Sequence, residues 1–193
     1  MHATIHSDGS WSGNMGGYGA LIHTPTSYQE IKGGMRCHSS GEAELIAAIK
    51  ALEALPPGVV TVDIYTDSMY LIQGATEWIE GWVDRGWKTA TGEPVKYAEL
   101  WDDLLTRMAP YEVTYRWVKG HNGDEGNTNA DSLASRGRKE FVQSLEDWAR
   151  QPAPPICPVC LNSPGRVILR GGRKVVRCVA CETASNKARN GRR

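Results

Sequence analysis

The chain has 193 residues, of which 40% are hydrophobic and 23% are charged, and its formal net charge is zero. This length allows one domain of ordinary size with a small appendage, and is short for two full domains. Because no apolar run approaches the roughly 18 residues of a membrane span, and the first residues lack the zones of a secretory signal, we expect a cytoplasmic protein.

The zero net charge hides two regions of opposite sign. Residues 1–151 carry 13 Lys and Arg against 21 Asp and Glu, whereas residues 152–193 carry nine against Glu182 alone. We therefore expect the two regions to have different roles. Four of the five cysteines lie in the basic region as two Cys-x-x-Cys pairs, a pattern that in a cytosolic protein indicates a metal site before it indicates disulfides.

The acidic region begins with three predicted strands, at residues 3–8, 18–23 and 28–37. They favour an antiparallel meander, with a glycine-rich turn at 11–17 between the first two. Ser39 and Glu42 then have the spacing of a capping box, in which Ser39 caps a helix and Glu42 reaches back to it. This helix places its apolar residues on one face.

Further elements alternate along the rest of this region: a strand at 59–65, a helical stretch at 69–87, a helix at 97–108, a strand at 112–118 and a last helix. The last helix has apolar residues at helical spacing from Ala130 to Trp148, enough to pack along a sheet. These elements predict an α/β domain with a mixed sheet. The tryptophans at 78, 82, 87 and 101 could stack on bases, but their helical spacing favours a core role.

Four carboxylates stand where this arrangement could bring them together. Asp8 and Asp67 each follow a predicted strand, and parallel strands end at the same edge of a sheet, where open α/β sheets place their sites. Glu44 and Asp131 lie early in the first and last helices. Each acid alone is explained by a turn or a helix terminus. Four together would repel one another unless divalent ions neutralise them, and oxygen ligands favour Mg²⁺ or Mn²⁺.

The segments around these acids follow one another in a distinctive order: Ser7-Asp8-Gly9-Ser10, Gly16-Gly17-Tyr18-Gly19-Ala20, Glu44-Leu45-x-Ala47-Ala48-Ile49, Thr66-Asp67-Ser68, Trp117-Val118-Lys119-Gly120-His121 and Asn129-Ala130-Asp131. From residue 3 to about 148 the chain resembles type 1 ribonuclease H in collinear order. The resemblance implies the ribonuclease H-like fold, a mixed five-stranded sheet with helices on both faces.

The resemblance also implies a reaction. Two Mg²⁺ ions, or Mn²⁺ ions, would flank a scissile phosphate about 4 Å apart, one activating the attacking water and the other stabilising the leaving 3′-oxygen. The residues that would hold them are Asp8, Glu44, Asp67 and Asp131. His121 matches the family's mobile histidine, which is thought to assist proton movement or product departure.

The substrate implied by the resemblance is the RNA strand of an RNA/DNA hybrid, cleaved to leave a 5′-phosphate. Asn14, Ser39 and Ser40 lie where the family places polar groups for hybrid and phosphate contacts. Two alternatives stay open: a metal nuclease of the same fold that acts on another duplex, and a non-catalytic module that only binds hybrids. We expect a monomer.

The basic region predicts a small metal-bound module. Residues 151–156 form a proline-rich linker, 157–184 a zinc ribbon and 185–193 a basic disordered tail. Two strands with a two-glycine turn, at 167–170 and 173–177, would form the ribbon's hairpin. The ligands of one structural Zn²⁺ would be Cys157, Cys160, Cys178 and Cys181. A rubredoxin-like iron centre is the alternative, because four thiolates accept either metal.

The ribbon is a candidate for holding the substrate. Residues 77–99 have a net charge of −2, so the helical stretch that grips the hybrid in lysine-rich relatives is acidic here and repels phosphate. We expect the basic residues of the ribbon to contact nucleic acid instead: Arg166, Arg170, Arg173, Lys174 and Arg177. A protein-docking ribbon is the alternative.

Overall fold

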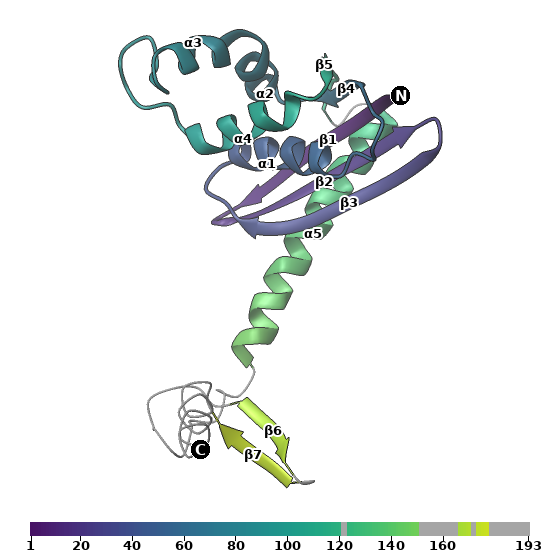
Figure 1. Ribbon diagram of the computed structural model, residues 1–193, viewed down its shortest axis with the longest axis vertical. Coiled ribbons are helices and arrows are strands. Elements are labelled where there is room, and N and C mark those ends of the chain that lie inside the picture. Colours follow the sequence, from purple (N-terminus) through teal and green to yellow (C-terminus); the bar gives the residue numbers. More distant parts are fainter. Residues whose placement is uncertain (121–122, 151–165, 171–172, 178–193) are drawn as a thin grey trace, which may run out of the picture. The chain divides into compact units, whose positions relative to one another are not determined.

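The computed structural model describes residues 1–120, 123–150, 166–170 and 173–177. Its first compact unit, Met1–Glu146, is built on a five-stranded sheet in the order β3-β2-β1-β4-β5 (Figure 1). The strands are β1 (His2–Ser12), β2 (Met15–Thr24), β3 (Ser27–Arg36), β4 (Thr61–Thr66) and β5 (Glu112–Trp117). Strands β1 to β3 form an antiparallel meander, and β4 and β5 run parallel to β1. The predicted mixed sheet is confirmed.

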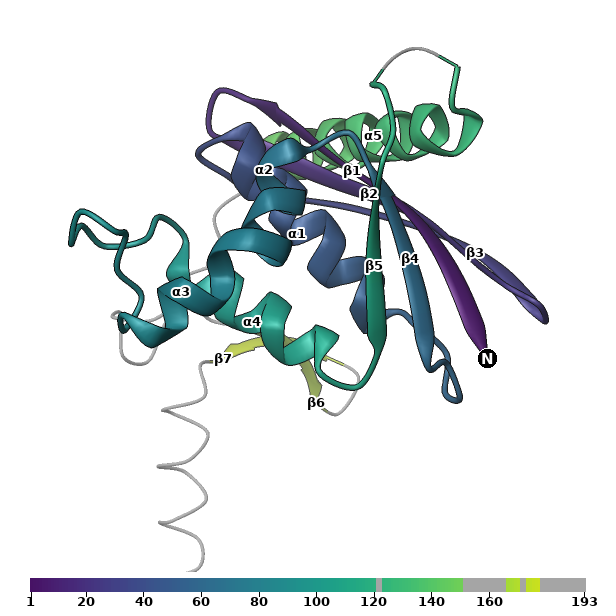
Figure 2. The ribbon, with the colours of Figure 1, turned by 90° about the horizontal axis from the view of Figure 1, so that it is seen from above.

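Helices cover both faces of this sheet, as the sequence predicted. They are α1 (Ser40–Glu53), α2 (Met69–Gln73), the π-helical turn η1 (Gly74–Trp78), α3 (Ile79–Asp84), α4 (Ala98–Met108) and α5 (Glu125–Arg150). Figure 2 shows α1 and α5 on opposite sides of the strands. The helical stretch predicted at 69–87 is therefore three short elements in succession, and it ends at Asp84.

The prediction of a glycine-rich turn at 11–17 is wrong. Ser12 pairs with Met15 and Trp11 with Gly16, so both strands continue through most of this segment. Only Gly13 and Asn14 form the turn, and Gly13 has a positive φ of 64°. A two-residue hairpin turn commonly needs positive φ, which glycine adopts without a Cβ penalty. The hairpin is consequently longer than the sequence suggested.

The start of α1 confirms the predicted N-cap. The Ser39 hydroxyl accepts the backbone N–H of Glu42 at 3.2 Å, which satisfies one donor of the first turn. The second half of the predicted capping box is wrong by one residue, because the Glu42 carboxylate accepts the N–H of His38 at 2.7 Å. Two hydrogen bonds between side chains and backbone thus stabilise the first turn of α1.

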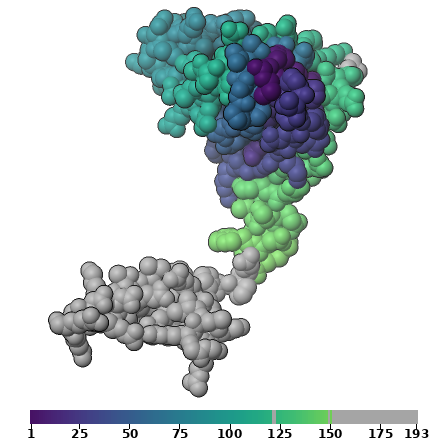
Figure 3. Space-filling view, turned by 45° about the vertical axis from the view of Figure 1, so that its right-hand side comes forward, coloured from purple at the N-terminus to yellow at the C-terminus, as the bar shows by residue number. Residues whose placement is uncertain are grey.

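The core of the first unit lies between the sheet and α1. Alternate residues of β1 and β4 point into it, and Ile5, Val62 and Ile64 are fully buried. Helix α1 contributes an alanine-rich face that lets it lie close to the strands. Figure 3 shows the N-terminal strands packed directly against the middle part of the chain. This core holds β1, β4 and α1 together.

Helices α2 to α4 meet in an aromatic cluster. Trp101 is fully buried, lies 5.4 Å from Tyr70 and 5.3 Å from Trp82 between ring centroids, and donates its indole N–H to the Tyr70 hydroxyl at 3.2 Å. Trp78 lies beside Trp82 at 5.6 Å. The predicted core role is confirmed for Trp101. Trp82 and Trp87 are partly buried against the same core, and Trp78 is partly buried beside Trp82.

Helix α5 lies on the other face of the sheet, over a set of glycines. A Cβ at Gly19 would stand 2.3 Å from the carbonyl oxygen of Ala130, and one at Gly17 would stand 2.2 Å from that of Ala134. Helix α5 therefore packs directly against the backbone of β2 at these glycines. The prediction that the apolar stripe packs as far as Trp148 is wrong at its end, because Trp148 is 74% exposed.

The second compact unit comprises Asp147–Arg193. Within it, β6 (Arg166–Arg170) pairs antiparallel with β7 (Arg173–Arg177), which confirms the predicted hairpin strands. The linker, the two-glycine turn, the four paired cysteines and the basic tail lie outside the described residues. Among the described residues, no helix is both long and apolar enough to cross a membrane.

Candidate active site

The parallel pairing of β1 with β4 brings two acids to one edge of the sheet. His6 lies opposite Tyr65 in the register of these strands. Since paired parallel strands advance together, Asp8 comes level with Asp67 two residues further on. Asp8 lies within β1, and Asp67 directly follows the last residue of β4.

Glu44 reaches the same point from α1. Gly9 makes this possible, because a Cβ there would stand 2.4 Å from the carbonyl carbon of Ala43 and from the backbone nitrogen of Glu44. Any larger residue at Gly9 would push the first turn of α1 away from β1. Ligand oxygens of Asp8, Glu44 and Asp67 consequently lie within 4.8 Å of one another.

Asp131 joins this group from α5. It forms a side-chain hydrogen bond with Asp8 and, by its charge, raises the pKa of that carboxyl. Its position follows from Gly19, which pairs with Asp8 in the sheet and lets the α5 backbone at Ala130 come into contact. All four predicted acids therefore interact: Asp8 from within β1, Asp67 from the end of β4, and Glu44 and Asp131 from two helices.

The electrostatics of the cluster are those of crowded carboxyls. Burial, together with the charges of Asp67 and Asp131, raises the pKa of Asp8 to about 8. Burial also raises the pKa of Glu44 well above its usual range, and Asp8 and Asp67 add to the shift. One buried oxygen of Glu44 has no hydrogen-bond partner among the described residues. Without a counter-charge, the cluster therefore retains protons at neutral pH.

These residues fit a divalent cation. An ion among them would satisfy the buried Glu44 oxygen and replace the retained protons. Carboxylate oxygens are the preferred ligands of Mg²⁺, which binds through few protein ligands and keeps several waters.

A cavity of about 540 Å³ adjoins the acids. It is lined by Ser39, Ser40, Gly41, Glu44, Ser68, Met69, Tyr70, Lys96 and Tyr97. Two of the three predicted substrate contacts, Ser39 and Ser40, line it. The third, Asn14, is exposed in the turn between β1 and β2, where its carbonyl oxygen accepts the N–H of Cys37 at 3.1 Å.

Tyr97, which shapes this cavity, was missed by the reasoning from sequence. Its hydroxyl lies 2.8 Å from the Ser39 hydroxyl, and its backbone adopts the left-handed region with a φ of 59°. The ammonium of Lys96 lies 4.9 Å from the centre of its ring. Tyrosine rarely adopts this conformation, so nothing in the local pattern predicts it.

Other predicted site residues lie where the structure describes no side chain. His121 is outside the described residues, but Gly120 before it is close to the acids, since a Cβ there would stand 2.2 Å from Oδ2 of Asp67. Cys157, Cys160, Cys178 and Cys181 are also outside the described residues. Arg166, Arg170, Arg173, Lys174 and Arg177 belong to β6 and β7, of which the backbone alone is described.

Residues 1–139 match the protein family described as RNase H. This match covers well over half of the chain and contains all four acids. It ends before the last turns of α5, so residues 140–193 lie beyond it.

Curated relatives agree with the family match. The chain is 43% identical over 143 residues to a ribonuclease H of Polynucleobacter asymbioticus, covering 73% of this chain and 92% of the relative. It is 47% identical over 135 residues to a ribonuclease H of Cupriavidus pinatubonensis, covering 69% and 92%. Among solved structures, LC9-RNase H1, a type 1 RNase H with the type 2 active-site motif, matches with a TM-score of 0.65 and 26% identity, over 78% of this chain and 81% of that one.

Proposed function

Because this chain belongs to the ribonuclease H family, we propose that it is an endoribonuclease that hydrolyses the RNA strand of RNA/DNA hybrids with divalent metal ions. The observation that carries the proposal is the acidic cluster of Asp8, Glu44 and Asp67, with Asp131 hydrogen-bonded to Asp8. Four interacting acids, two of them with raised pKa values, are costly to a fold, and a metal-dependent phosphodiesterase needs them.

The chain's own residues would prepare the site in a defined way. The raised pKa values of Asp8 and Glu44 favour their protonated forms without metal, and on metal binding these groups would give up their protons, so that the four carboxylates could hold the ions beside the scissile phosphate. Two Mg²⁺ or Mn²⁺ ions, once bound, would activate a water and stabilise the leaving 3′-oxygen. We assign His121 to proton movement or product departure, since Gly120 before it adjoins Asp67.

The cavity beside Glu44 supports a role for Ser39 and Ser40 in binding the hybrid. Ser39 and Tyr97 share one hydrogen bond, and whichever hydroxyl donates it, the other O–H remains available. Lys96 adds a positive charge at the same wall. A hydroxyl donor beside an ammonium suits a phosphate oxygen. Asn14, on the exposed hairpin turn, would contact the hybrid at a second point.

The basic region has a separate role in this proposal. We assign residues 1–150 to the catalytic domain, 151–156 to a linker, 157–184 to a zinc ribbon and 185–193 to a basic tail. Cys157, Cys160, Cys178 and Cys181 would hold one structural Zn²⁺, and the basic side chains of β6 and β7 would bind nucleic acid. The opposite charges of the two regions support this division. We expect the protein to act as a cytoplasmic monomer.

The decisive experiment is cleavage of a hybrid labelled on its RNA strand. Mg²⁺ should support cleavage to products with 5′-phosphates, and EDTA should stop it. Asp67→Asn should reduce the turnover number by at least about a thousandfold, since it removes one metal ligand. Its thermal unfolding should stay close to that of wild type.

Substrate choice distinguishes the alternatives. Parallel reactions with double-stranded RNA and double-stranded DNA should show no cleavage. Cleavage of either duplex in preference to the hybrid would favour a different nuclease of the same fold. Binding of the hybrid without cleavage under any metal would show a binding module.

Metal analysis tests the ribbon separately. Purified protein should contain one zinc per chain, and replacing Cys157 and Cys178 by serine should remove it. Iron in place of zinc would support the rubredoxin-like alternative. The absence of bound metal would contradict both.

A further inference from the structure

A second set of polar side chains follows the acids along the seam between β1 and α5. Ser10 lies two residues beyond Asp8 on the same face of β1, and Ser135 lies one helical turn beyond Asp131. Their hydroxyl oxygens are 3.4 Å apart. The seam thus continues from Asp8 and Asp131 into a pair of hydroxyls.

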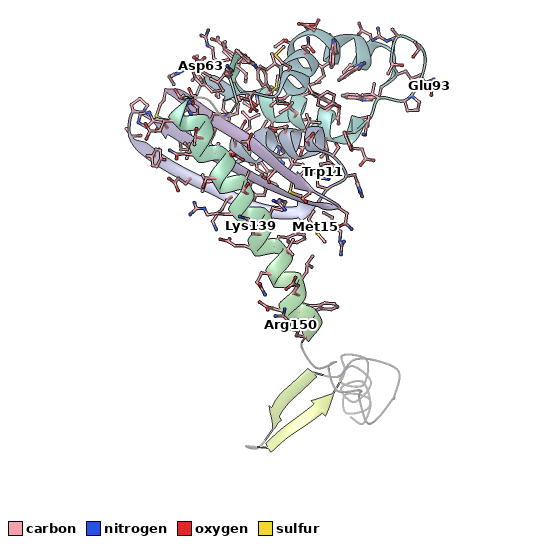
Figure 4. All side chains as sticks on the ribbon, turned by 180° about the vertical axis from the view of Figure 1, so that it is seen from behind. Trp11, Met15, Asp63, Glu93, Lys139 and Arg150 are labelled. Carbon is pink, nitrogen blue, oxygen red and sulfur yellow. The ribbon has the colours of Figure 1, made fainter. Side chains whose placement is uncertain are left out.

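Arg138 closes this seam. It lies seven residues after Asp131 on α5, and its Nε donates to the Ser10 hydroxyl at 3.0 Å. The base of its side chain lies directly over Gly17 of β2, because a Cβ at Gly17 would stand 2.8 Å from the Arg138 Cβ. Figure 4 shows the neighbouring Lys139 on α5 and Met15 at the hairpin end of the sheet. The guanidinium is therefore fixed by both the helix and the hairpin.

The two terminal nitrogens of Arg138 remain available. Among the described residues, no hydrogen bond or ion pair engages them, and the one contact of the guanidinium is through Nε. Lys32, another cation that faces α5, is instead paired with Glu140. In a region with eight more acids than bases, an anchored guanidinium whose two amino groups are free points to an anionic ligand.

The distance from the acids suits nucleic acid. Seven residues of α-helix advance by about 10 Å. Neighbouring residues of a nucleic-acid strand advance by about 3.4 Å along the duplex axis, so about 10 Å corresponds to three of them. A strand that runs along α5 from a scissile phosphate at Asp8 and Asp131 would therefore bring another of its phosphates to this guanidinium.

We infer that Arg138 binds a phosphate of the RNA strand two or three nucleotides from the scissile bond, with Ser10 orienting the guanidinium through Nε. This inference rests on the proposed function, since it takes the acids as the point of cleavage. It assigns to Arg138 a bidentate contact with one phosphate, which lysine cannot reproduce.

Binding without cleavage tests the inference. The full-length Asp67→Asn protein is combined with Arg138→Gln, Arg138→Lys or the control Arg136→Gln, and the dissociation constant for a hybrid is measured at several salt concentrations. Arg136 is a suitable control because it carries the same charge on the same helix but is exposed two residues away. Arg138→Gln should weaken binding about tenfold at low salt and reduce the salt slope by about 0.9.

The two other variants sharpen the result. Arg138→Lys should keep most of the salt slope but bind several-fold more weakly than the arginine protein. Arg136→Gln should leave both quantities close to the parent. An equal slope in Arg138→Gln and the parent, or a fall in thermal stability that accounts for weaker binding, would overturn the inference.

Neutral linkages locate the phosphate. Hybrids with a single methylphosphonate in the RNA strand are compared on the parent and on Arg138→Gln. The parent should bind more weakly when the methylphosphonate lies two or three nucleotides from the cleavage position. The dissociation constant of Arg138→Gln should not change with that same linkage. Sensitivity of both proteins at every position would contradict the assignment. Failure of the wild type to cleave any hybrid would refute the proposed function, while these binding measurements would still report on Arg138.

Discussion

The acidic and the basic regions of this chain differ in composition and in charge. Residues 1–146 form a unit whose buried core positions four acids at one edge of a sheet, and the cost of bringing the acids together is borne by that core. The basic region has few apolar residues, four paired cysteines and a charge of +8. We propose that cleavage, which needs fixed acids, belongs to the acidic region and that much of the attraction of phosphate, which needs positive charge, comes from the basic region.

The largest effect should come from the acidic region alone. Glu44→Gln should lower the turnover number about a thousandfold and leave KM nearly unchanged, because it removes a ligand and not a substrate contact. In EDTA the same variant should unfold at a higher temperature than wild type, since it removes a carboxyl that is buried beside the charges of Asp8 and Asp67. Steady-state kinetics and thermal unfolding measure both. A raised KM with a normal turnover number would show that Glu44 acts in substrate binding and not in cleavage.

The next effect tests whether packing positions the acids. Gly19→Ala places a Cβ 2.3 Å from the α5 backbone, so α5 must shift and Asp131 with it. We expect a loss of about 3 kcal/mol in the free energy of unfolding, measured with denaturant, and lowered turnover.

Gly58→Ala is the matched control for this change. Gly58 has a positive φ, but a Cβ added there would meet nothing within 4 Å, so alanine should cost about 1 kcal/mol and leave turnover intact. A loss in Gly19→Ala no larger than that in Gly58→Ala would show that α5 accommodates the added Cβ at little cost.

Removal of the basic region should affect binding and not turnover. A protein that ends at Gln151 loses nine Lys and Arg and one Glu. We expect an unchanged turnover number, a KM about tenfold higher and a shallower dependence of KM on salt. Cleavage kinetics between low and moderate salt measure these quantities. An unchanged KM would refute the hypothesis that the ribbon holds the substrate and would favour a protein-docking role.

The last prediction concerns the pH dependence of stability. Asp8 has a pKa of about 8 in the folded protein against an ordinary 3.8, so the folded state binds more protons than the unfolded state between these values. Stability in EDTA should therefore fall as pH rises from about 4 to about 8. Mg²⁺ should oppose this fall at high pH, because it replaces the protons. Unfolding temperatures with and without Mg²⁺ measure the effect, and Asp8→Asn should flatten the curve in EDTA.

Much of the fold follows from the sequence alone. Alternating apolar residues predict the strands, and Ser39 predicts the start of α1. The convergence of the acids follows from the parallel pairing of β1 with β4, which the order of elements implies. The resemblance to ribonuclease H adds the identity of the acids, which local patterns explain equally well as turn and helix-end residues.

Other features depend on contacts that local patterns do not encode. The left-handed Tyr97 is held by a hydrogen bond to Ser39, 58 residues away in the chain. The bond from Arg138 to Ser10 joins residues 128 positions apart. The extension of β1 and β2 through a glycine-rich segment arises because pairing with a neighbouring strand outweighs weak local propensity.

The glycines beside Asp8 have a consequence for how the protein tolerates change. Gly9 meets the backbone of α1 and Gly19 meets the backbone of α5, so main chain touches main chain on both faces of the sheet. The spacing of the acids is then set by contacts that ordinary side-chain substitutions elsewhere do not alter. Conservative substitutions within the hydrophobic core are therefore expected to leave the geometry of the acidic cluster in place.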